Sequence, residues 1–136
     1  MSGHANPDTA FEGLDLDLVM PARVRSGKTV QLTLRVVNRS NREIDLYLRG
    51  RSITFDVEVA RTNGEVVWRL LGDEIIPAIV HLQTLGVGGR LEARANWDQR
   101  ERGRVLAPGD YAARGLLLLE TTSLETSWHP LRIDER

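Results

Sequence analysis

An alternation of apolar and polar residues with a period of two recurs along this chain and constrains its fold more than any other feature. The clearest example is residues 30–36, where Val, Leu, Leu and Val alternate with Gln, Thr and Arg. Successive side chains of a β-strand point to opposite faces, so this period predicts a strand with one buried face. We predict further strands over residues 14–18, 44–48, 53–59, 66–71, 91–97, 111–119 and 128–133.

Turn signals separate these segments at spacings of about 8–12 residues, and the chain has no long amphipathic helical pattern. Asn63-Gly64 predicts a hairpin with a type I′ turn. Residues 72–89 are ambiguous, because Pro77 interrupts them and their apolar residues fit a helical turn or an edge strand. So many half-apolar strands are best buried in an all-β protein, an antiparallel β-sandwich of about eight or nine strands.

Length and charge narrow the class of protein. A chain of 136 residues is typical of one domain, which we place over residues 11–136 after a polar, disordered start at residues 1–10. A net charge of -1 argues against nucleic-acid binding, and no run approaches the ~20 apolar residues of a membrane span. The start has no signal-peptide layout and there is no cysteine, so we expect a cytoplasmic protein without disulfides.

No catalytic constellation is visible in the sequence. The histidines His4, His81 and His129 are far apart and lack metal-ligand spacing. No serine lies in a GxSxG motif, and the glycine-rich residues 86–89 are not followed by the Lys-Ser/Thr pair of a phosphate-binding loop. We therefore expect no enzyme activity, no cofactor and no metal.

The large aromatic residues read as parts of a scaffold. Trp68 and Trp97 are in phase with the apolar residues of their strands, which favours a core position over an exposed sugar-stacking platform. Between Trp97-Asp98 and Pro108-Gly109-Asp110-Tyr111 lies a charged loop, and the hydroxyl of Tyr111 is placed to hold its far end.

An ordered set of short motifs resembles the family of the Bacillus intracellular proteinase inhibitor BsuPI. The motifs are Val36-Val37-Asn38-Arg39-Ser40, Gly50, Phe55-Asp56-Val57, Gly64-Glu65-Val66-Val67-Trp68-Arg69, Leu85 with Gly88, Trp97-Asp98, and Pro108-Gly109-Asp110-Tyr111. The resemblance implies an immunoglobulin-like sandwich that inhibits an intracellular subtilisin-type serine protease. The partner would be a protein, with no nucleic acid and no membrane involved.

Two functions remain open at this point. An inhibitor would use the loop 98–107, where we predict that Arg104, Val105 and Leu106 contact the protease and that replacing Val105 and Leu106 with Gly leaves stability nearly unchanged. The alternative is a non-inhibitory interaction module that binds another protein through an edge strand or through residues 72–89.

Overall fold

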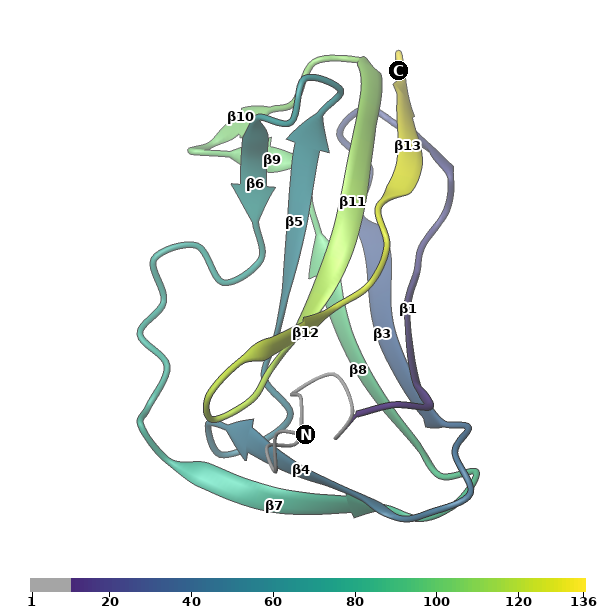
Figure 1. Ribbon diagram of the computed structural model, residues 1–136. Coiled ribbons are helices and arrows are strands. Elements are labelled where there is room, and N and C mark those ends of the chain that lie inside the picture. Colours follow the sequence, from purple (N-terminus) through teal and green to yellow (C-terminus); the bar gives the residue numbers. More distant parts are fainter. Residues whose placement is uncertain (1–10) are drawn as a thin grey trace.

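Thirteen strands make up the regular structure of residues 11–136, the part of the chain that this computed structural model describes (Figure 1). Nine have four or more residues: β1 (Leu14–Val19), β3 (Val30–Asn38), β4 (Ile44–Arg49), β5 (Phe55–Arg61), β6 (Val66–Arg69), β7 (Val80–Leu85), β8 (Arg90–Trp97), β11 (Gly109–Leu118) and β13 (His129–Asp134). Four are shorter: β2 (Arg23–Arg25), β9 (Arg100–Glu101), β10 (Arg104–Val105) and β12 (Ser123–Glu125). The predicted all-β class is confirmed. The expectation of a disordered start at residues 1–10, with His4, lies outside the described residues.

The strands form two layers and two smaller ribbons. One layer has the order β1-β3-β8, and the other has the order β2-β13-β11-β5-β6, with β12 paired to β11. Figure 1 shows β5, β11 and β13 running in front of β3 and β8. The β4–β7 ribbon crosses one end, and the β9–β10 ribbon lies beside β6 at the other. Every pairing is antiparallel except that of β2 with β13, and the whole is an immunoglobulin-like sandwich.

The core lies where the apolar faces of the two layers meet. The alternating residues of β3 face those of β5 and β11, and all of them are almost completely buried: Leu32, Leu34, Val36, Val57, Val59, Ala113 and Leu117. Each of the buried Leu and Val side chains contributes about 1.5–3 kcal/mol on burial, so these strands dominate the stability of the fold.

Two local expectations need revision. The hairpin at residues 63–64 exists, but only Gly64 has a positive φ (92°), and its N–H donates to Arg61 O at 2.9 Å. This is a type I turn followed by a left-handed glycine rather than a type I′ turn, and a bulge between Val59 and Ala60 accompanies it. In residues 72–89 the edge-strand alternative is realised as β7, and no helix occurs in this segment.

Asn38, at the end of β3, is the polar centre of one end of the sandwich. Its side chain is fully buried, and its amide Nδ2 donates to the carbonyl oxygens of Arg42, Leu85 and Gly86 at 2.8–3.1 Å. Its Oδ1 accepts from the N–H and the hydroxyl of Ser40. One amide thereby joins the β3–β4 turn to the β7–β8 turn.

Replacing Asn38 with Ala should therefore destabilise the protein by about 2–4 kcal/mol, because the buried Leu85 carbonyl and the partly buried Arg42 and Gly86 carbonyls lose a donor. Urea unfolding monitored by circular dichroism measures this change. Asn96→Ala, at an exposed asparagine of β8, is the matched control and should change stability by less than about 0.5 kcal/mol. Equal stability of the two variants would contradict the assigned role of Asn38.

A charged pair reinforces the parallel contact between β2 and β13. Arg23 donates to both carboxylate oxygens of Asp134, at 2.9 and 3.2 Å. The hydrogen bonds from Arg23, with its charge and that of Arg132, hold the pKa of Asp134 below its usual value. The guanidinium is well exposed, so solvent screening keeps the contribution to stability small.

The sign of the resulting pH dependence follows from this lowered pKa. The unfolded chain takes up the proton near pH 4, above the folded pKa of Asp134, so the stabilisation is present above about pH 4 and is lost as the pH falls through the folded value. Asp134→Asn should lower the melting temperature at pH 7 slightly and flatten its fall below pH 4. Melting curves from pH 2 to pH 7 test this, with Asp73→Asn as the exposed control. Parallel curves for wild type and Asp134→Asn would refute the assignment.

Candidate functional site

The predicted loop 98–107 is largely a hairpin. β9 and β10 pair antiparallel, with Glu101 opposite Arg104 and Val105 opposite Arg100. The turn between them is Arg102-Gly103, with φ values of 53° and 81°. Two positive φ values in a two-residue connection are typical of a type I′ turn, whose twist matches that of paired strands. The type I′ geometry expected at residues 63–64 is therefore found here.

The base of this hairpin is buried and hydrogen-bonded. Gln99 is fully buried with a φ of 62°, and its amide Nε2 donates to Arg25 O at 2.6 Å and to Lys28 O at 2.8 Å. The N–H of Leu106 donates to Gln99 O at 2.8 Å. Sequence reasoning missed Gln99, since a glutamine in a charged stretch gives no sign that it is buried. Its amide connects the hairpin to the turn that precedes β3.

Aromatic residues fix the two ends of the same segment. Trp97 is 1% exposed at the end of β8. The hydroxyl of Tyr111 donates to Ala107 O at 2.6 Å, which holds the chain as it leaves the hairpin. At the other end Asp98 accepts from the N–H of Arg100 at 3.0 Å. The exposed Pro108 precedes β11, whose first residue is the partly buried Gly109.

Trp68 links the hairpin to β6. Its ring lies 5.2 Å from that of Trp97, tilted by 33°. Trp68 was predicted in the core, but it is only partly buried and packs against the edge of the core. The reason is its position on β6, which ends its sheet and has a single neighbouring strand, β5. Two motif residues at the start of β5 also have structural roles. Phe55 is buried, and the side chain of Asp56 accepts a hydrogen bond from the N–H of Leu71 at 3.0 Å.

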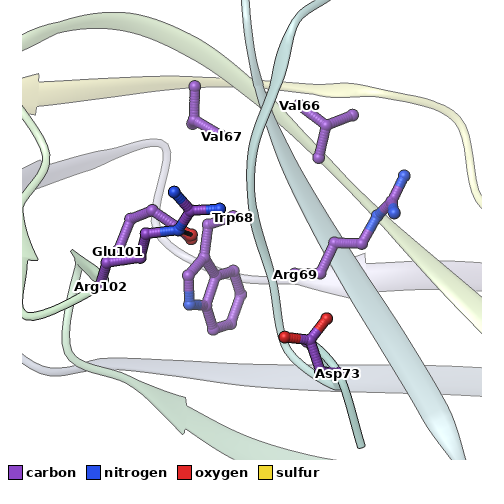
Figure 2. A pocket seen from close by; sticks show the side chains of 8 residues that line it. Val66, Val67, Trp68, Arg69, Asp73, Glu101 and Arg102 are labelled. Carbon is purple, nitrogen blue, oxygen red and sulfur yellow. Dashed lines mark ion pairs between the residues drawn. The ribbon is translucent and has the colours of Figure 1, made fainter.

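A groove of about 290 Å³ separates β6 from the tip of the hairpin (Figure 2). Figure 2 shows the indole of Trp68 between Arg102 on one side and Asp73 on the other. We call it the β6–β9 groove; its lining is Val66, Val67, Trp68, Arg69, Gly72, Asp73, Glu101 and Arg102. It carries two positive and two negative side chains and contains no serine, cysteine or histidine. Such a lining of charged and apolar side chains suits a protein contact.

The three predicted contact residues differ in their accessibility. Arg104 is exposed and Val105 is partly buried, whereas Leu106 is 8% exposed and belongs to the core cluster. The expectation that replacing Leu106 leaves stability unchanged is therefore wrong. At the end of the hairpin this side chain points into the core. The exposed tip is instead Arg102-Gly103-Arg104.

No metal-binding cluster accompanies the groove among the described residues. Within residues 11–136, no group of three or more His, Asp or Glu side chains could hold a metal ion. His81 has a structural role, since its Nδ1 lies 2.9 Å from Gly50 O. The same residues include no helix long and apolar enough to cross a membrane.

Comparison with known families places this chain. The model of the BsuPI family, intracellular proteinase inhibitors, matches residues 19–122. The chain therefore belongs to this family. Among curated protein sequences, none matches it.

Solved structures resemble the fold at low sequence identity. The Pseudomonas fluorescens alkylpurine DNA glycosylase AlkC is 14% identical with a TM-score of 0.50, over 90% of this chain and 30% of the glycosylase. A Listeria innocua β-glucosidase is 9% identical (TM-score 0.46, 88% of this chain and 16% of the enzyme). A CARDB domain from Pyrococcus furiosus is 15% identical (TM-score 0.45, 90% of this chain and 87% of the domain). This chain thus spans less than a third of the two enzymes, and the glycosylase likeness concerns the fold alone.

The burial of Leu106 gives a direct test. Leu106→Ala should destabilise the protein by about 2–4 kcal/mol, since it leaves a cavity in the core. Arg104→Ala, two residues away on the exposed side, should change stability by less than about 0.5 kcal/mol. Chemical unfolding of both variants measures these changes. A Leu106→Ala protein as stable as wild type would contradict the burial of this side chain.

Proposed function

We propose that this protein inhibits an intracellular serine protease of the subtilisin type and that the β9–β10 hairpin enters the protease cleft. Membership of the proteinase-inhibitor family supports inhibition in general. The serine class of the target, the location in the cytoplasm and the action of residues 11–136 as one domain are parts of the same proposal. The partner is a protein, and no catalysis by this chain is required.

The observation that carries the proposal is the anchoring of the hairpin. An inhibitory segment must keep its conformation in the cleft. A flexible segment would lose conformational entropy on binding, and it could take up the geometry in which the protease cleaves it. Here the base of the hairpin is held by buried Trp97, Gln99 and Leu106. The tight Arg102-Gly103 turn restricts the backbone conformation of the tip. The tip is exposed, and so is one residue of each strand, Arg100 on β9 and Arg104 on β10.

The hairpin also has the shape that an extended binding cleft accepts. Proteins often bind a partner by adding one β-strand to an edge, with main-chain hydrogen bonds for affinity and alternate side chains for specificity. We propose Arg102 and Arg104 as the exposed contacts and Val105 as a partly buried one. Leu106 supports them from the core and is not a contact itself. The β6–β9 groove with Trp68 would border the protease surface.

A non-inhibitory interaction module is the second candidate. The observation in its favour is that β6 and β7 each have one paired neighbour among the described strands and therefore present a free edge. Such a module would bind its partner through one of these edges, and the β9–β10 hairpin would not contact the partner. The two candidates differ in whether changes at the hairpin tip affect protease activity.

Titration of an intracellular subtilisin-type protease with the purified protein tests the proposal. We expect saturable inhibition and an intact complex on size-exclusion chromatography. The double variant Arg102→Glu/Arg104→Glu should weaken inhibition at least about tenfold, since it reverses both exposed charges at the contact.

The matched control is Arg51→Glu/Arg90→Glu, which makes the same charge change at exposed arginines outside the hairpin. It should inhibit like wild type. Undiminished protease activity with wild type would reject the inhibitor function. Equal inhibition by both double variants would be consistent with the inhibitor function but would show that the hairpin tip is not the contact.

A further inference from the structure

The free edge of β7 lacks the protection that other strand edges of this protein have. Exposed edges invite pairing with other chains, and proteins block them with charged side chains, proline or bulges. At the ends of the two main layers, β1 carries Asp15 and Asp17, β2 is Arg23-Val24-Arg25, β6 carries Arg69, and β8 carries three charged residues. By contrast, residues 75–89 contain no Asp, Glu, Lys or Arg, in a chain of which 27% is charged.

The backbone of β7 shows which residues face outward. Gly50 N donates to Ile79 O at 2.7 Å, so residues 50 and 79 form a hydrogen-bonded pair of the β4–β7 ladder. Hydrogen-bonded and non-hydrogen-bonded pairs alternate along an antiparallel ladder. In the observed register, Leu48–His81 and Leu46–Gln83 are then hydrogen-bonded, whereas Tyr47–Leu82 is not. The backbone N–H and C=O groups of Val80, Leu82 and Thr84 therefore point away from β4.

Tyr47 supports this assignment independently. Its carbonyl oxygen accepts from Glu120 N at 2.9 Å, on the side of β4 where Leu48 bridges to Leu119. The backbone of Tyr47 is thus directed away from β7. Its partner Leu82 must likewise be directed away from β4, toward the free edge.

The side chains over this edge are apolar and exposed. Leu82 is 53% exposed and Tyr47, directly opposite it, is 50% exposed. Ile79 is 41% exposed just before the strand. In Figure 1 the β4–β7 ribbon lies at one end of the molecule, away from the β9–β10 hairpin. The surface is therefore separate from the proposed protease contact.

We propose that β7 pairs antiparallel with β7 of a second copy of this chain. Because residues 75–89 carry no Asp, Glu, Lys or Arg, the edge of β7 has no charge that would attract an oppositely charged partner. The β7 edge of a second copy is equally uncharged, so no like charges meet when the two edges pair. An antiparallel pair related by a two-fold axis is self-complementary, as in most homodimers. The product is a continuous sheet with the order β4-β7-β7-β4.

The outward-facing residues determine the register. With Leu82 on the two-fold axis, it lies opposite Leu82 of the second copy, and Val80 lies opposite Thr84. These are the three residues of β7 whose N–H and C=O groups point away from β4, and no strand within residues 11–136 pairs with them there. The two Leu82 side chains then continue the exposed row begun by Tyr47 and bury apolar surface between the copies. One six-residue strand per copy is a small interface, so we expect dissociation in the micromolar range.

Analytical ultracentrifugation over about 1–300 μM protein, spanning the dissociation constant expected of such an interface, tests the proposal. We expect a concentration-dependent dimer for wild type. Leu82→Lys and Leu82→Glu should each be monomeric throughout, because like charges meet on the axis. An equimolar mixture of the two variants should restore the dimer, which also shows that both are folded.

Val87→Lys is the matched control, since Val87 is 64% exposed in the same uncharged segment but lies outside β7. It should dimerise like wild type. A wild type that is monomeric over the whole range would overturn the proposal. Unchanged dimers of Leu82→Lys, a mixture that stays monomeric, or an equal loss in Val87→Lys would overturn it as well.

Discussion

The contact between the apolar faces of the two layers is the interaction on which the rest of this structure depends. β3 alternates apolar and polar residues over most of its length, so its apolar face is stable only when a second sheet covers it. β3 supplies one face and β5 with β11 the other. Two of the buried polar side chains, Asn38 and Gln99, lie at the ends of β3, where the ladder stops and backbone groups need other partners.

Two buried amides satisfy those ends. Asn38 closes the last residue of β3 by donating to three carbonyls, and Gln99 donates to the carbonyls of Arg25 and Lys28 just before its first. A carboxamide does this well, because its NH₂ group carries two N–H donors without a charge that burial would penalise; at Asn38 one of the two is shared between two carbonyls. At one end the result is a closed pair of turns. At the other, the same chemistry holds a projecting hairpin, so the stability of the scaffold and the rigidity of the candidate site have a common origin.

The strand edges separate two kinds of surface. The edge at β6 lies next to the hairpin, is short and carries Arg69, which pairs with the buried Glu58 at 3.0 Å. The edge at β7 is longer, uncharged and distant from the hairpin in the fold. A sandwich of this kind can therefore present a specific contact at one end and a self-pairing strand at the other without one obstructing the other.

The sequence by itself determined the class of fold and most of its strands, because alternation with a period of two reports directly which residues face a core. It also determined the family, through residues that shape turns and fill the sandwich. It did not reveal the buried Gln99, the inward turn of Leu106 or the partial exposure of Trp68. Those depend on where a sheet ends and on which neighbour covers a side chain, and only the packing of strands distant in sequence decides that.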